Sequence, residues 1–157
     1  MKIRSILKIA IVMLFAMALL TVPAAASIDI DEDVDLSTGT FTFVPSNNAS
    51  ASYTVNWMTV MGALEKAQDE NILTYSAADT WYDDYGSFYL TDINGVSDDY
   101  DNHKAWFLYI DGEYLSYGLG LNSIDEEECA QFKYHEYDTT TWEPIGNPIH
   151  SIDLNVE

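Results

Sequence analysis

The chain has 157 residues, of which 26 are acidic and six basic, and its formal net charge is −20. This length fits one domain, and so acidic a surface repels phosphate backbones and anionic lipids, which argues against nucleic acid and membrane-surface partners. The single cysteine, Cys129, excludes an intramolecular disulfide. Because it lies in an alternating, strand-like stretch, we expect it to be a buried structural thiol.

Residues 1–26 have the pattern of a secretory signal peptide. Three basic residues precede an apolar run at residues 9–22, and Pro23 and three alanines follow. We expect cleavage after Ala26 and export to the cell exterior or cell surface, with an uncleaved N-terminal anchor as the alternative. The chain after Ala26 contains all 26 acidic residues against three lysines, a formal net charge of −23.

Residues 27–38 form an acidic segment, which we expect to be either a flexible start or a first edge strand. Residues 39–157 are expected to form a single domain. Residues 39–44 and 51–55 alternate apolar and polar side chains, so they predict the two strands of a hairpin. Its turn contains Asn48-Ala49-Ser50, an N-glycosylation acceptor on an expected exposed loop.

Residues 59–70 predict the one clear helix of the chain. Apolar side chains at helical spacing form one face of it: Val60, Ala63, Leu64 and Ala67. Thr59 is placed to cap the N-terminus by accepting a backbone N–H bond. Gly62 in the first turn allows another backbone to approach closely, as a sheet lying across the helix would.

Residues 76–86 predict a polar loop that carries three large aromatic side chains, Trp81, Tyr82 and Tyr85. Two interpretations stay open for this aromatic loop. The side chains either fold back as a lid on the core or form an exposed platform for a flat ligand or a sugar.

A strand at residues 87–93 and a turn at Asn94-Gly95 are expected to lead into an acidic loop at residues 96–104. Calcium prefers oxygen ligands, and this loop supplies several of them. The alternatives are a calcium site and a solvated acidic loop. The carboxylates concerned are Asp98, Asp99 and Asp101.

Residues 106–114 predict the central hairpin. All five residues from 106 to 110 are apolar or aromatic. Because successive side chains of a strand point to opposite faces, both faces of this strand carry apolar side chains. Asp111-Gly112 follows, and this dipeptide between apolar runs is a strong hairpin signal because Gly accepts a positive φ at little cost. Further strands are predicted at residues 129–137 and 149–156.

The sequence contains none of the common catalytic motifs. We find no nucleophile elbow, no HExxH pattern, no phosphate-binding Gly loop and no His/Cys metal spacing. We therefore expect a protein that is not an enzyme.

Three motifs, in this order, resemble the family named for the C-terminal domain of transcobalamin and intrinsic factor. They are Thr59 with Gly62-Ala63-Leu64, Ile93-Asn94-Gly95, and Trp106 through Asp111-Gly112. The resemblance extends over residues 39–137. It implies an α+β, β-grasp-like fold with one helix packed on a small mixed β-sheet with hairpins, in a protein outside the cell. In the vertebrate carriers, such a domain closes over cobalamin beside a helical domain that has no counterpart here.

We therefore expect an extracellular, non-catalytic binding module that requires no cofactor, with a corrinoid as the leading candidate ligand. The alternative is a cell-surface structural or interaction domain that binds another protein or a glycan. Aromatic side chains of the loops would make apolar contacts with the ligand, and backbone groups of the loop at residues 118–120 would approach its edge. These residues are Trp81, Tyr85, Tyr114, Tyr117, Gly118 and Gly120.

Overall fold

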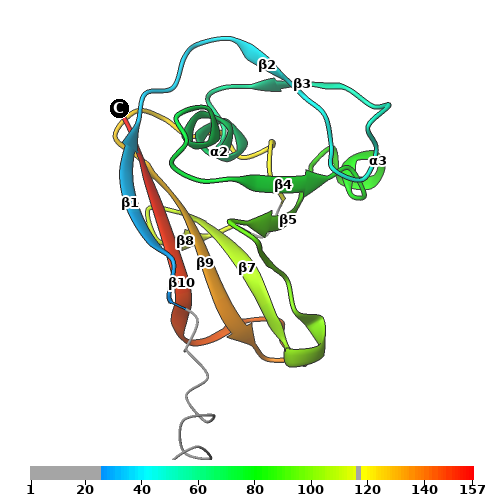
Figure 1. The fold of residues 1–157 in the computed structure, drawn as a ribbon, viewed down its shortest axis with the longest axis vertical. Helices are drawn as coiled ribbons and strands as arrows, with labels where there is room; N and C mark the ends of the chain where they lie inside the picture. The colour runs from blue at the N-terminus through cyan, green and yellow to red at the C-terminus, as the bar shows by residue number, and fades with distance from the viewer. Residues whose placement is uncertain (1–25, 116–117) are drawn as a thin grey trace, which may run out of the picture.

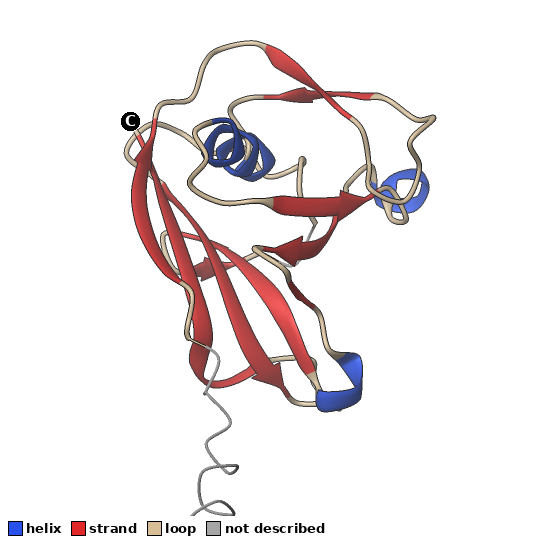
Figure 2. Cartoon of the chain, in the orientation of Figure 1, coloured by secondary structure: helices blue, strands red, loops and turns tan. Residues whose placement is uncertain are grey.

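The computed structural model describes residues 26–115 and 118–157, and the analysis of the fold concerns these residues. Strands dominate, and helices are few and short (Figure 2). The elements in chain order are β1 (Asp29–Val34), β2 (Thr40–Phe43), β3 (Tyr53–Asn56), α2 (Val60–Asp69), β4 (Tyr75–Ala78), α3 (Tyr82–Tyr85), β5 (Tyr89–Ile93), β6 (Val96–Ser97), the 3₁₀ helix η1 (Tyr100–Asn102), β7 (Lys104–Ile110), β8 (Glu113–Tyr114), β9 (Cys129–Tyr137) and β10 (Pro144–Val156).

The predicted α+β class is confirmed, with α2 packed on mixed sheets that contain hairpins. The largest sheet has five strands in the order β1-β10-β9-β7-β8, and β1 runs parallel to β10 while the other pairs are antiparallel. Two smaller sheets, β2-β3 and β4-β5-β6, lie with α2 on one side of this sheet (Figure 1). The strands therefore form three sheets, where the sequence predicted a single small one.

The core lies between α2 and the five-stranded sheet. The predicted apolar face of α2 is fully buried, and so are alternate residues of β9 and β10, including Phe132, Ile152 and Leu154. Burying a side chain of this size contributes roughly 1.5–3 kcal/mol. Burial of this helix face therefore holds α2 against the five-stranded sheet.

The start of α2 is built as the sequence predicts. Thr59 Oγ1 accepts a hydrogen bond from the Gly62 N–H at 3.1 Å. A Cβ atom at Gly62 would lie 1.9 Å from the Trp57 carbonyl oxygen, so this position needs glycine. The backbone that approaches the helix is thus the segment just before it, not a strand of the sheet.

The acidic N-terminal segment contributes an edge strand. β1 pairs with β10 over its whole length, from Asp29 opposite Ser151 to Val34 opposite Val156. The folded part of the chain therefore extends beyond Gly39 toward the N-terminus. β10 is longer than the predicted strand at residues 149–156, and its pairing with β9 is irregular between Ile145 and His150.

The prediction of a polar loop over residues 76–86 is wrong, because this stretch contains most of a strand and a short helix. β4 begins at Tyr75 and pairs with β5, and the short helix α3 follows. The loop's aromatic side chains separate: Tyr82 stacks on Phe88 with ring centroids 5.0 Å apart, so it belongs to the core side. Trp81 and Tyr85 stay exposed.

The central hairpin is confirmed. Asp111 and Gly112 both have positive φ, at 49° and 81°, which is the geometry of a tight two-residue turn between β7 and β8. Asp111 Oδ1 also accepts a hydrogen bond from the Cys129 N–H at 2.9 Å. Cys129 is half-buried, and burial beside acidic groups raises the pKa of its thiol to about 11.

The predicted signal peptide falls almost wholly on residues 1–25, which lie outside the described residues. In the part of the chain that the structure describes, no helix has the length and apolar character needed to cross a membrane.

Candidate binding site

A small cleft opens between the α3–β5 region and the edge of β7. Its volume is about 80 Å³. Aromatic side chains make up most of its wall, so we call it the aromatic cleft. The lining residues are Trp81, Tyr89, Leu90, Trp106, Phe107, Leu108, Tyr114, Leu115 and Gly118.

Trp81 and Tyr89 form one wall of the aromatic cleft. Their ring centroids are 4.6 Å apart, with the planes tilted by 54°. Trp81 lies directly before α3 and is 40 % exposed, so the indole offers an open apolar face. Tyr85, on the last turn of α3, is 64 % exposed and its ring lies 6.4 Å from Trp81. Tyr85 therefore flanks this wall without lining the cleft.

The Tyr89 ring is fixed from behind by the acidic loop. Its hydroxyl donates to Asp98 Oδ2, and the Tyr100 hydroxyl donates to the same oxygen at 3.2 Å. Asp98 Oδ1 accepts the backbone N–H of Trp106 at 2.9 Å. Burial raises the pKa of the Asp98 carboxyl, and burial with the hydrogen bond to Asp98 raises the pKa of Tyr89.

Tyr114 also lines the cleft. It lies on β8 directly after the hairpin turn and is 54 % exposed. Its ring lies 5.9 Å from Phe107 and 5.7 Å from Tyr109. The tight turn at Asp111-Gly112 thus places Tyr114 beside the aromatic side chains of β7.

Gly118 allows the cleft to close at its base. A Cβ atom there would lie 2.3 Å from the Phe88 carbonyl oxygen and 3.1 Å from the Trp81 ring. Phe88 and Leu119 exchange two backbone hydrogen bonds at this point. Gly118 therefore serves close packing of the protein's own backbone as well as lining the cleft.

The structure brings together three of the six residues predicted to bind the ligand: Trp81, Tyr114 and Gly118. Gly120 does not line the cleft; it lies against the Phe88 ring, with a positive φ of 92°. Tyr117 lies outside the described residues.

The three carboxylates of the predicted calcium site do not form a ligand cluster. Asp98 turns inward to Tyr89 and Trp106, while both oxygens of Asp99 accept hydrogen bonds from Asn102. Over residues 26–115 and 118–157, no group of three or more His, Cys, Asp or Glu side chains is placed to hold a metal ion. Calcium binding by this loop stays a prediction.

Sequence reasoning missed several residues of the cleft, Tyr89 and Phe107 among them. Both lie inside predicted strands, where aromatic side chains are usual core material. The alternation along residues 106–110 indicates only that Phe107 lies on the opposite face of the strand from Trp106 and Leu108. No local pattern shows that β5 and β7 face each other across a cleft.

The aromatic cleft is suited to binding a ligand through apolar contacts with its rings. Rings supply apolar area with defined geometry, and exposed tryptophan and tyrosine side chains are typical of recognition surfaces. The cleft is too small to enclose a drug-sized molecule, which needs about 300 Å³ or more. A ligand would therefore insert one edge or side group and lie against the exposed rings outside.

Comparisons with known proteins match the chain to a protein family. No curated protein matches the chain, and no solved structure does. Among protein families, the one described as "Domain of unknown function (DUF4430)" matches residues 58–136, half of the chain. The matched region runs from the start of α2 through nearly all of β9 and contains all the residues that line the aromatic cleft. The chain belongs to the DUF4430 family.

Proposed function

We propose that this protein is a non-catalytic binding module outside the cell, and that the aromatic cleft is its ligand site. The observation that carries the proposal is the convergence of Trp81, Tyr114 and Gly118 on one cleft. Trp81 lies directly before α3, whereas Tyr114 and Gly118 both lie after the β7–β8 turn. Their residue types and their places in the sequence also predict a ligand-binding role.

A corrinoid is the ligand we propose to test first. The resemblance to the transcobalamin and intrinsic factor family supports this choice, and so does the character of the cleft. A corrinoid has a flat, largely apolar ring with polar side groups, which suits the exposed faces of Trp81 and Tyr114. It is far larger than 80 Å³, so only a side group would enter the cleft while the ring lies across the opening.

A cell-surface interaction domain is the second candidate, and a different region of the molecule favours it. Trp142 is 61 % exposed and stacks on Tyr137 with ring centroids 5.1 Å apart. Ile145 and Ile149, at the start of β10, are exposed as well. Such side chains around the β9–β10 turn would suit a protein or glycan partner.

Calorimetric titration of the purified protein with cyanocobalamin separates these candidates. Trp81→Ala should weaken binding by about tenfold or more, the effect of losing roughly 1.4 kcal/mol of stacking and buried area. Trp142→Ala is the matched control, because it removes an exposed indole that does not line the cleft, and it should leave the affinity unchanged. Equal affinities for the wild-type protein and Trp81→Ala would contradict a ligand site at the aromatic cleft.

A further inference from the structure

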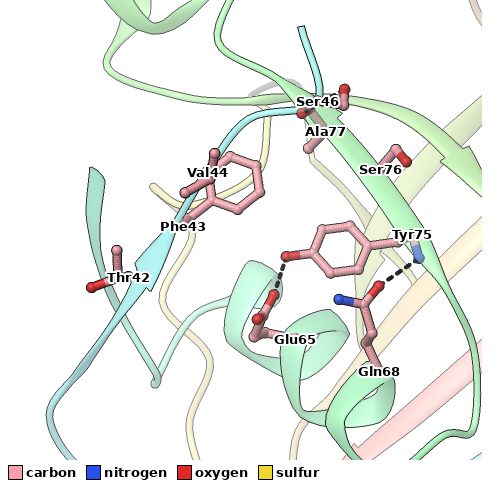
Figure 3. A pocket seen from close by; sticks show the side chains of 9 residues that line it. All are labelled: Thr42, Phe43, Val44, Ser46, Glu65, Gln68, Tyr75, Ser76 and Ala77. Atoms are coloured by element: carbon pink, nitrogen blue, oxygen red, sulfur yellow. Dashed lines mark hydrogen bonds between the residues drawn. The ribbon is translucent and has the colours of Figure 1, made fainter. Parts of the chain in front are cut away.

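A second cavity lies on the other side of β4, between β2 and α2. Its volume is about 220 Å³, and polar groups dominate its exposed wall. Figure 3 shows Phe43 from β2 on one side of this polar cavity and the Tyr75 ring on the other, with Glu65 and Gln68 reaching up from α2. The remaining lining residues are Thr42, Val44, Ser46, Ser76 and Ala77.

The free edge of β4 forms one wall of the polar cavity. The Tyr75 N–H donates to Gln68 Oε1 at 3.2 Å, and the Ala77 carbonyl accepts from the Ser46 N–H at 2.8 Å. In a strand, the N–H and C=O of one residue point to the same edge. The Tyr75 carbonyl and the Ala77 N–H therefore also face away from β5, toward the cavity.

These two backbone groups are not used by the neighbouring strand. Because both point away from β5, the β4–β5 pairing leaves them unused, and no hydrogen bond outside the paired strands reaches either group among the residues that the structure describes. Buried backbone groups are nearly always hydrogen-bonded, to water where protein is absent. The cavity thus presents one acceptor and one donor, at fixed spacing, to whatever occupies it.

Glu65 and Gln68 add two further groups with fixed orientation. Glu65 Oε2 accepts a hydrogen bond of 2.6 Å from the Tyr75 hydroxyl, which leaves Oε1 without a partner among the described residues. No lysine pairs with Glu65 in this part of the chain; the two ion pairs are Lys66 with Glu70 and Lys104 with Glu136. Since Gln68 Oε1 is used by Tyr75, its amide nitrogen is the group left to donate (Figure 3).

We infer that the polar cavity binds a small hydroxylated amine, with an amino sugar as the ligand class. The Glu65 carboxylate is the complement of an ammonium group, and a charge-assisted hydrogen bond is about twice as strong as a neutral one. Hydroxyl groups can serve both the Ala77 N–H and the Tyr75 carbonyl. The Phe43 and Tyr75 rings provide the apolar walls against which a sugar ring packs. This site is separate from the aromatic cleft and does not depend on the function proposed for it.

Glucosamine, with glucose as the neutral probe of the same shape, tests this inference. We would titrate each into the ¹⁵N-labelled protein and follow the amide signals of Tyr75 and Ala77 by NMR. Glucosamine should shift the Ala77 amide saturably and bind about tenfold more tightly than glucose. The absence of a saturable shift at Ala77, or equal binding of the two sugars, would overturn the inference.

Variants of α2 identify the group that recognises the amine. Glu65→Gln keeps an acceptor for the Tyr75 hydroxyl but removes the charge, so it should abolish the preference for glucosamine. Glu70→Gln removes one charge from the same helix outside the cavity and should leave binding unchanged. Gln68→Glu keeps the acceptor for the Tyr75 N–H and adds a carboxylate, so it should tighten glucosamine binding. Equal weakening by Glu65→Gln and Glu70→Gln, or no gain with Gln68→Glu, would contradict the assignment.

Discussion

The Tyr89 hydroxyl donates a hydrogen bond to the Asp98 carboxylate, and this contact connects the acidic loop after β6 to a wall of the aromatic cleft. Asp98 has a second attachment, since its other oxygen accepts the Trp106 N–H. One side chain thus fixes a residue of β5 and a residue of β7, the two strands between which the cleft opens. A carboxylate that looked like a calcium ligand in the sequence has a structural role.

Replacing Asp98 by alanine should lower the free energy of unfolding by about 2 kcal/mol or more, because the Tyr89 hydroxyl and the Trp106 N–H lose their shared acceptor. Urea unfolding followed by circular dichroism measures this loss. Asp101→Ala, in an exposed position of the same loop, should change stability by no more than about 0.5 kcal/mol. Similar losses in the two variants would show that the Asp98 contacts contribute no more to stability than an exposed carboxylate of the same loop.

Replacing Gly62 by alanine should destabilise the protein even though alanine is the better helix former by about 1 kcal/mol. The added Cβ atom would lie 1.9 Å from the Trp57 carbonyl oxygen, so the backbone before α2 must move. We expect a net loss of about 3 kcal/mol or more, visible as a lower Tm. Gly146→Ala has open space around the added Cβ and meets only the strain of a positive φ of 68°, so it should cost about 1–2 kcal/mol. A higher Tm for Gly62→Ala would contradict the close approach.

His150 should make stability depend on pH. Its Nδ1 atom accepts the Ile28 N–H at 2.9 Å, and the ring is packed against Tyr134 and Trp106. Burial lowers its pKa, so the folded state resists protonation. Stability contributed by neutral His150 is complete above the unfolded pKa of about 6.5 and is lost as the pH falls through it toward the lower folded value.

The matched variant for this effect is His150→Asn, whose side-chain oxygen can accept the Ile28 N–H but does not titrate. The stability of the wild-type protein relative to His150→Asn should fall between pH 7 and pH 5. Denaturant unfolding across this range measures the difference. Because His135 and the carboxylates are common to both proteins, their titration cancels. A constant difference would show that His150 is not coupled to folding.

The sequence predicts those parts of the fold that local signals define. The helix pattern with its Thr59 cap, the Asp111-Gly112 turn and the alternation of β9 all appear at the expected residues. Each depends on neighbours within a few positions along the chain.

Features that depend on distant residues could not be predicted in the same way. β1 pairs with β10 across most of the chain, and the apolar residues at alternate positions of residues 28–36 do not identify that partner. β4 lies in a stretch of serine and alanine that reads as a loop, and its pairing with β5 makes it a strand. The split of the aromatic loop, with Tyr82 in the core and Trp81 exposed, likewise depends on where Phe88 and Tyr53 lie.

The candidate site shows the same limit. Trp81 could be selected because a large aromatic side chain is unusual in a polar loop, Tyr114 as an aromatic residue at the end of the hairpin, and Gly118 because glycine lets a backbone approach a ligand closely. Tyr89 and Phe107 could not, because a strand aromatic gives no sign of whether it packs inward or lines a cleft. No sequence pattern predicts the polar cavity. One of its walls is the edge of β4, and the backbone groups there are the same whichever residues form the strand.

The most direct test of the central claim is a titration of the purified wild-type protein with cyanocobalamin, followed by calorimetry and by absorbance of the corrin ring. Binding at micromolar or tighter dissociation constants, about −8 kcal/mol, is the result that the aromatic cleft predicts for a corrinoid. Saturable heat and a shift in the corrin spectrum should appear together. No heat and no spectral change would contradict corrinoid binding and leave the interaction domain, with its exposed Trp142 region, as the remaining candidate.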